Sequence, residues 1–255
     1  MGALVSRVGS GTVTDDVRAA FRRLHSAGTF VLPNPWDVPS ARLLEHLGFP
    51  ALATTSSGFA ASLGRTDQHV TRDELAAHVA ALTAAVRVPV SVDAERGYAD
   101  DPAGVAETVR MLADAGASGV SIEDYDPGTA RIAPVDVAAE RIAAAASVCS
   151  RYGMVLTGRA ENHLYGTSDL HDTIARLIAY RDAGAACVYA PGLTDLGDIA
   201  RVVGEVGVAV NVLALRNGPT VSQLADIGVR RVSTGGSLAW AAYGALVHAA
   251  MELRD

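Results

Sequence analysis

Eight short apolar runs alternate with longer amphipathic stretches along almost the whole chain. The stretches between the runs place apolar residues at helical spacing, as Val105, Val109 and Leu112 do. Strict alternation of strands and helices predicts a parallel sheet covered by helices. The runs predicted to be strands are Thr29–Leu32, Ala51–Thr55, Val88–Asp93, Gly119–Glu123, Met154–Arg159, Cys187–Pro191, Val208–Leu213 and Arg231–Thr234.

A repeated pattern favours a closed barrel over an open sheet. Four segments consist of a helix end, a glycine, two or three residues and a strand, and their glycines are Gly48, Gly116, Gly184 and Gly228. An open, doubly wound sheet usually has a glycine-rich turn after its first strand, whereas this chain has LPNPWDVPS there. We therefore predict a single (β/α)₈ TIM barrel over residues 1–255, with residues 1–12 as a loose N-terminal arm.

The charged residues and cysteines exclude several classes of function. The net charge is −7 and there is no basic stripe, which argues against nucleic-acid binding. All 21 basic residues are arginine, so a Schiff-base lysine is impossible and lysine aldolases are excluded. Cys149 and Cys187 lie outside any zinc-type cluster. Neither a leader peptide nor a membrane-spanning stretch is visible, and we expect a cytoplasmic protein.

Acidic residues gather at the ends of two neighbouring predicted strands. Asp93 and Glu95 end the third strand, two residues apart on a segment expected to be extended, and Glu123 and Asp124 end the fourth. The carboxyl ends of barrel strands form the active-site face. Carboxylates converging there repel one another unless a cation lies between them, and oxygen ligands suit Mg²⁺, with Mn²⁺ as an alternative. Helix capping or pairing with arginine is the competing structural interpretation.

Other strand ends carry groups suited to holding a small carboxylate. Arg159 ends the fifth strand and can grip a carboxylate through two hydrogen bonds, or else form a structural ion pair. Ser57 and Gly58 belong to a small polar segment, expected to be a turn, that follows the second strand and leaves backbone N–H groups free. Asp67 follows as a further acid, and Asn211 on the seventh strand is a candidate hydrogen-bonding residue.

Taken together in this order, the segments SSGFAASLGRTD, SVDAERGYAD, GVSIED, TGRAEN, VNVLA and STGGSLA resemble the isocitrate lyase/phosphoenolpyruvate mutase superfamily. The resemblance covers about residues 30–242. It implies that Asp93, Glu95 and Glu123 are the acids of a Mg²⁺ site. It also implies homo-oligomers, tetramers or dimers, in which the C-terminal helix is swapped between subunits. It further implies that Ser57, Gly58 and Phe59 hold the substrate's carboxylate and that Arg159 contacts its 2-oxo or 2-oxyanion end. With Asn211, predicted from its place on the seventh strand, these residues are the expected substrate-binding set.

One segment departs from the family pattern. After the fourth-strand acid, carbon–carbon lyases of this family have a loop with a Lys-x-Cys-Gly-His type of motif, whose cysteine is the proton donor. Here the loop reads DYDPGTARIAPVD and has no lysine, cysteine or histidine. The phosphoenolpyruvate mutase branch has a lysine and an asparagine there, and both are absent. The candidates to replace the donor are Tyr125, Asp126, Arg131, Tyr98 and His163.

These observations favour a Mg²⁺-dependent lyase that cleaves a carbon–carbon bond in a small 2-hydroxy or 2-oxo (di)carboxylic acid through a metal-stabilised enolate. Arg159, Asp67, Glu123 and Tyr125 are the predicted catalytic residues. One alternative keeps the site and changes the reaction, to oxaloacetate decarboxylation or hydrolysis or to phosphorus–carbon bond chemistry. Another is a barrel that has lost catalysis and binds a metabolite. We expect a small-molecule carboxylate as substrate and no nucleic-acid or membrane partner.

Overall fold

The computed structural model describes residues 13–166 and 168–254, so the predicted N-terminal arm lies outside the described residues. Within these ranges, eight strands form one sheet in the order β1-β10-β9-β8-β7-β4-β3-β2, and every pairing in it is parallel. The strands are β1 (Phe30–Leu32), β2 (Leu52–Ala53), β3 (Val90–Asp93), β4 (Gly119–Glu123), β7 (Val155–Arg159), β8 (Cys187–Tyr189), β9 (Ala209–Leu213) and β10 (Arg231–Ser233).

The edge strands β1 and β2 close the sheet through the residues that follow them. The backbone N–H of Ala53 donates to the carbonyl of Pro33 at 3.0 Å. Beside it, Asn34 Nδ2 donates to the carbonyl of Thr54 at 2.7 Å. These bonds bring the two ends of the sheet together, and the predicted (β/α)₈ barrel is confirmed.

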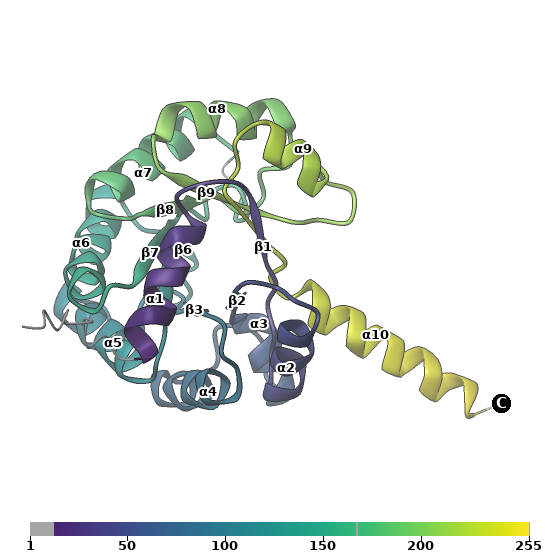
Figure 1. Cartoon of the computed structure of the whole chain (residues 1–255). Coiled ribbons are helices and arrows are strands. Elements are labelled where there is room, and N and C mark those ends of the chain that lie inside the picture. The colour runs from purple at the N-terminus through teal and green to yellow at the C-terminus, as the bar shows by residue number, and fades with distance from the viewer. Residues whose placement is uncertain (1–12, 167, 255) are drawn as a thin grey trace, which may run out of the picture.

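Helices surround the barrel, and a hairpin extends from one strand (Figure 1). The hairpin β5–β6 (Tyr125–Asp126 and Arg131–Ile132) directly follows β4. The helices are α1 (Val13–Leu24), α2 (Val38–His46), α3 (Ser56–Ser62), α4 (Arg72–Ala85), α5 (Pro102–Asp114), α6 (Val135–Tyr152), α7 (Leu170–Asp182), α8 (Leu196–Val206), α9 (Val221–Asp226) and α10 (Ser237–Glu252).

The four repeated glycines end helices as their spacing predicts. Gly48, Gly116, Gly184 and Gly228 have φ angles of +87°, +95°, +107° and +89°. A residue with a Cβ is strained in this left-handed region, whereas glycine adopts it freely and lets the chain reverse into the next strand. Each of the four therefore marks a helix-to-strand junction.

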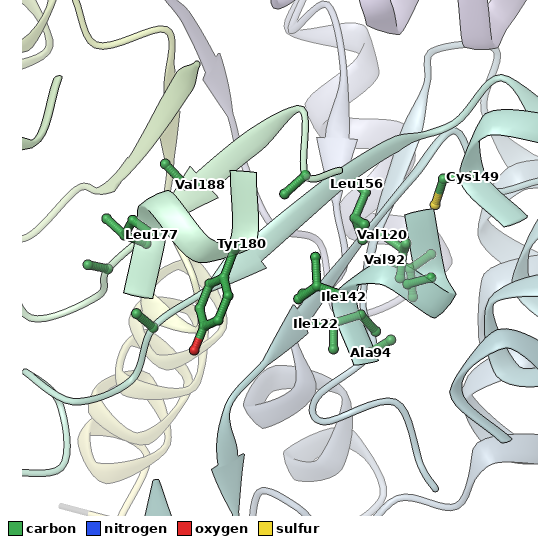
Figure 2. Packing of buried hydrophobic residues seen from close by; sticks show 14 of the residues in the cluster. Val92, Ala94, Val120, Ile122, Ile142, Cys149, Leu156, Leu177, Tyr180 and Val188 are labelled. Atoms are coloured by element: carbon green, nitrogen blue, oxygen red, sulfur yellow. The ribbon is translucent and has the colours of Figure 1, made fainter. Parts of the chain in front are cut away.

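The main apolar core lies between the strands and the helices outside them. Figure 2 shows Val92, Val120 and Leu156, from three neighbouring strands, close to Ile142 of α6. All four side chains are at most 2% exposed. Burying an aliphatic side chain of this size contributes roughly 1.5–3 kcal/mol, so this layer is a main source of the stability that holds the strand ends in place.

Helix α1 lies across the barrel, as Figure 1 shows. Its fully buried Phe21 belongs to a second apolar cluster with Phe30 of β1 and Val155 of β7. The approach is so close that a Cβ on Gly119 would lie 2.7 Å from Cε1 of Phe21, so only glycine fits there. The start of β4 and the position of α1 therefore depend on each other.

The last helix, α10, differs from the other long helices because it projects away from the barrel (Figure 1). Ala239 is its only buried residue among those described, while large apolar side chains are more than half exposed. Those side chains are Trp240, Leu246, Val247 and Met251. In the described part of the chain, no helix combines the length and apolarity required to cross a bilayer.

Candidate active site

A cavity of about 210 Å³ lies at the carboxyl ends of the barrel strands. Parallel barrels place their active sites at this end, because the loops that follow the strands converge there. Five of the residues singled out from the sequence line the cavity: Ser57, Asp67, Asp93, Arg159 and Asn211. The structure thus brings together groups from segments that are far apart in the chain.

Asp93 ends β3 and presents its carboxylate to this cavity. The backbone N–H of Ser56 faces Oδ2 at 3.3 Å, and the Ser121 hydroxyl faces Oδ1 at 3.5 Å. The backbone N–H of Asp93 itself donates to Oγ1 of Thr54 at 2.9 Å. Neighbouring strands therefore hold the carboxylate in place, and oxygen lone pairs remain for another ligand.

Glu95 reaches the same region by a different route from the one expected. The extended segment predicted for Asp93–Glu95 is wrong, because Glu95 has a φ of +48° and lies in a turn. Its side chain is buried, and the hydroxyl of Tyr98 donates to Oε1 at 3.0 Å. Burial, assisted by the charge of Asp93, raises the pKa of Glu95 to about 7.

Arg159 is the central cation of the site. One terminal nitrogen lies 3.4 Å from Oδ1 of Asp93 and 3.3 Å from Oε2 of Glu123, and Nε contacts Glu161. Burial favours the neutral form of the guanidinium, but Glu161, Glu123 and Asp93 outweigh burial and raise the pKa of Arg159. The guanidinium also lies 5.3 Å from the ring centre of Tyr189.

Glu123 lies directly behind this arginine. Its side chain is only 3% exposed, and Nε2 of Gln68 donates to Oε1 at 3.0 Å. Burial raises the pKa of Glu123 well above its usual range, although Arg159 opposes that shift. Burial, together with Asp93, also raises the pKa of Asp67 on the cavity wall. Negative charge therefore accumulates here beyond what one arginine neutralises.

Asp124, next to Glu123 in the chain, belongs to a separate network. Its carboxylate accepts hydrogen bonds from the Tyr180 hydroxyl at 2.6 Å, from the Glu161 backbone N–H at 2.8 Å and from Arg176 at 3.1 Å. Successive residues of a strand point to opposite faces, so only one of this acidic pair can face the barrel interior. Asp124 instead fastens α7 to the strand ends.

The expectation of a polar turn at residues 56–59 is also wrong. These residues form the first turn of α3, with the hydroxyl of Thr55 as its N-cap. Ser57 lines the cavity, but Phe59 stacks on His78 with ring centres 3.7 Å apart. Neither Phe59 nor Gly58 is among the residues that line the cavity. A Cβ on Gly58 would lie 2.6 Å from the Thr55 side chain, so this glycine serves packing.

Asn211 lies on the opposite wall within a chain of hydrogen bonds. Its Oδ1 accepts from Nε of Arg231 at 2.9 Å, and its Nδ2 donates to Oγ of Ser233 at 2.9 Å. Because Arg231 occupies the amide oxygen, the NH₂ group of Asn211 faces Ser233, which also lines the cavity. The role of Arg231 was missed, because nothing in the sequence pattern indicated which way this strand residue faces.

Three of the five proton-donor candidates have side-chain partners in the structure. Tyr125 stacks on Tyr165 with ring centres 3.6 Å apart, Tyr98 donates to Glu95, and Asp126 accepts from the Thr129 hydroxyl at 3.0 Å. Arg131 lies opposite Asp126 in the backbone register of the β5–β6 hairpin, and its side chain is exposed. The Nε2 atom of His163 is buried and has no hydrogen-bond partner in residues 13–166 and 168–254.

The carboxylate oxygens around the cavity fit a hard divalent cation that takes few of its ligands from the protein. Across the described ranges, no three His, Cys, Asp or Glu side chains are grouped closely enough to enclose an ion by themselves. Mg²⁺ is usually held by one or two carboxylates and keeps several waters, so it needs no such group. Asp93 lines the cavity, and burial, followed by the charges of neighbouring acids, raises the pKa values of Asp67, Glu95 and Glu123 around it, so a bound cation would favour their ionised forms.

The family model for phosphoenolpyruvate phosphomutase matches residues 21–254 of the chain. The chain belongs to the phosphoenolpyruvate mutase family. This confirms the resemblance seen in its strand-end segments. A solved structure described as a lyase/mutase from Burkholderia cenocepacia J2315 shares 49% identity and a TM-score of 0.91, and the match covers 95% of this chain and 89% of that one.

Two curated relatives extend the comparison. An uncharacterised protein, MT2054, from Mycobacterium tuberculosis (strain CDC 1551 / Oshkosh) is 38% identical, over 92% of this chain and 89% of its own length. The 2-methylisocitrate lyase of Aeropyrum pernix is 31% identical, over 69% of this chain and 58% of its own length. The relatives are thus members of a superfamily of lyases and mutases that act on small carboxylates.

Proposed function

We propose that the protein is a Mg²⁺-dependent lyase that cleaves a carbon–carbon bond in a small 2-hydroxy or 2-oxo (di)carboxylic acid. The proposal rests mainly on the surroundings of Arg159, whose guanidinium lies 3.4 Å from Asp93 and 3.3 Å from Glu123 at the cavity. A cation ringed by acids that keep raised pKa values is suited to binding a metal and an anionic substrate together. The 2-methylisocitrate lyase among the relatives supports this choice of reaction.

The acids, Arg159 and Asn211 have separate roles in this proposal. Asp93 would hold the ion directly, with Glu95 and Glu123 holding its waters, and Mn²⁺ could replace Mg²⁺. When bound, the ion would supply Lewis-acid stabilisation of the charge that develops on the substrate's 2-oxygen and carboxylate. Arg159 would orient that end of the substrate through its N–H donors, and Asn211 would donate from the far wall.

Proton transfer would use the acids and the hairpin. Glu123 and Asp67 have raised pKa values, so each takes up a proton more readily than an ordinary carboxylate does. Tyr125 is the proposed donor to the carbon that keeps the electron pair of the broken bond. Burial and the charge of Glu123 raise the pKa of Tyr165, the ring on which Tyr125 stacks. The stacked pair would therefore hold the Tyr125 hydroxyl ready for a substrate bound beside Glu123.

One observation favours a second reaction. The β5–β6 hairpin and its connections, DYDPGTARIAPVD, contain no cysteine, lysine or histidine. Decarboxylation of oxaloacetate leaves an enolate that solvent can protonate, so it requires no dedicated donor on this hairpin. Product analysis separates the two reactions, because only decarboxylation releases carbon dioxide. Hydrolysis of oxaloacetate, phosphorus–carbon chemistry and pure metabolite binding remain alternatives at the same site.

The test is thermal unfolding with Mg²⁺ and oxalate, added separately and together. We expect the melting temperature to rise most with both ligands present, because each stabilises binding of the other. The rise should vanish in Asp93→Ala and persist in Asp226→Ala, which removes an exposed carboxylate on α9. A panel of 2-oxo and 2-hydroxy acids then identifies the substrate. Stabilisation without turnover of any panel member would support the metabolite-binding alternative.

The assembly is a separate part of the proposal. We propose a homo-oligomer, a tetramer or dimer, in which α10 packs against another copy of the chain. The exposed apolar residues of α10 support this, because isolated chains rarely leave such a surface in water. Sedimentation of Leu246→Asp and Val247→Asp variants tests it. Loss of the oligomer with a retained barrel is expected, and a monomeric wild type would refute the assembly.

A further inference from the structure

A second cavity, of about 600 Å³, lies between the β5–β6 hairpin and the first half of α6. It shares no lining residue with the cavity at the strand ends. Two arginines line it, Arg131 from β6 and Arg141 from α6, together with one acid, Asp126. This cavity is therefore distinct from the one at the strand ends, and its charged lining residues are mainly cationic.

Arg141 carries a buried charge without an acidic partner. The residue is only 7% exposed, and a terminal nitrogen donates to the backbone carbonyl of Asp100 at 3.0 Å. The Nε atom of Arg141 has no hydrogen-bond partner in the described part of the chain, and the Arg141 side chain forms no ion pair within 4.0 Å there. Burial, followed by the nearby charge of Arg96, lowers the pKa of Arg141, and the smaller opposing effects of Asp126 and Asp100 do not offset them.

The other two charged residues of the lining, Asp126 and Arg131, do not neutralise the charge of Arg141. The carboxylate of Asp126 accepts from the Gly128 backbone N–H and the Thr129 hydroxyl, each at 3.0 Å, and faces Nε of Arg96 at 3.7 Å. Arg131 is exposed and forms no ion pair within residues 13–166 and 168–254. The lining therefore has two cations against one acid whose oxygens already have partners.

The beginning of α6 adds to the positive potential. Pro134, its N-cap, lines the cavity and provides no side-chain hydrogen bond to the helix. The N-terminus of a long helix carries partial positive charge and free N–H groups that favour anions. One acid competes for them, since Asp136 accepts from the N–H of Val137 at 2.9 Å.

We propose that this cavity binds a small oxyanion, a phosphate or a carboxylate group, through Arg131 and Arg141. The ligand would supply the negative charge that Arg141 lacks and would tie the hairpin to α6. This site is independent of the lyase proposal, because it uses none of the residues at the strand ends.

Calorimetric titration with inorganic phosphate, and separately with acetate, tests the site in a chloride background of constant ionic strength. We expect saturable binding of at least one anion, roughly tenfold or more weaker in Arg131→Gln and in Arg141→Gln. Arg151→Gln removes an exposed arginine near the end of the same helix, where it donates to the Ser147 carbonyl, and should bind as the wild type does. Because Arg131 is exposed, its variant should fold even if the Arg141 variant does not.

Chemical mapping locates the bound anion. Phenylglyoxal modifies accessible arginines, and mass spectrometry then identifies them. The binding anion should protect Arg131 and leave Arg151 equally reactive. Equal affinity in the wild type and both cavity variants, absence of saturation with either anion, or protection confined to other arginines would each overturn the proposal.

Discussion

Arg159 and Arg231 line the same cavity but are stabilised in opposite ways. Arg159, at the end of β7, is surrounded by carboxylates. Arg231, at the start of β10, donates to Oδ1 of Asn211 and Oγ1 of Thr157, both at 2.9 Å, and faces Nε2 of His25 at 3.3 Å. Arg231 forms no ion pair in the described part of the chain.

Arg159 belongs to a cluster of charged groups, whereas Arg231 belongs to a framework of neutral polar groups. Around Arg159 the acids outnumber the cation, which suits a place where charged ligands arrive and leave. Around Arg231 the partners are neutral, because Nδ1 of His25 hydrogen-bonds the Phe21 carbonyl while its other nitrogen faces the guanidinium. We infer that the first arginine serves chemistry and that the second orients Asn211 and fills the barrel.

The largest effect is expected from Arg159→Met. Removing this cation leaves the charges of Glu123 and Glu161 buried without the cation that neutralises them, which costs about 3–5 kcal/mol of unfolding free energy at neutral pH. Turnover should fall by roughly a thousandfold. Because the acids can then be neutralised by protonation, the stability loss should shrink as the pH falls from 8 to about 5. Urea unfolding over this range is the measurement, and a loss that does not change with pH would contradict it.

Arg231→Met should cost less stability, about 1–3 kcal/mol, because the orphaned partners are neutral. Its effect on turnover should appear mainly as a raised KM, since the Asn211 amide loses its orientation. Steady-state kinetics of this variant and of Asn211→Ala provide the check. A variant with a kcat as low as that of Arg159→Met would break the distinction between the two arginines.

A smaller effect concerns His25. Burial and Arg231 lower the pKa of His25 to about 3, so below its usual pKa of 6.5 the unfolded chain binds a proton that the folded chain does not. Stability is therefore lost as the pH falls from about 6.5 toward 3, by about 1–2 kcal/mol since the side chain is partly exposed. The unfolding free energy of the wild type minus that of His25→Gln should decrease over this range. A constant difference would show that burial and Arg231 do not hold this histidine neutral.

The smallest effect is expected from Tyr98→Phe, which removes the hydrogen bond from the Tyr98 hydroxyl to Oε1 of Glu95. Unfolding free energy at pH 8 should fall by about 1 kcal/mol, the net value of one such bond. Tyr152→Phe, whose hydroxyl bonds the exposed side of Asp114 at 3.1 Å, is the matched control and should change less. Equal losses would mean that burial does not strengthen the bond to Glu95.

Local pattern predicted much of this arrangement. Apolar runs indicated the eight strands, and the glycines that end helices indicated the turns into four of them, because both depend on nearest neighbours in the chain. The rule that barrel sites lie at strand ends then selected Asp93 and Arg159, which do meet at the cavity. The sequence by itself therefore determined the fold and the centre of the candidate site.

Only the tertiary structure decided which neighbours face inward and what they contact. Glu123 and Asp124 are adjacent acids, yet one contacts Arg159 and the other binds Tyr180 on α7. Phe59 stacks on a helix that follows it, and the His25–Arg231 contact joins residues 206 apart. Such contacts depend on how distant segments pack in three dimensions, which the local spacing of residue types does not encode.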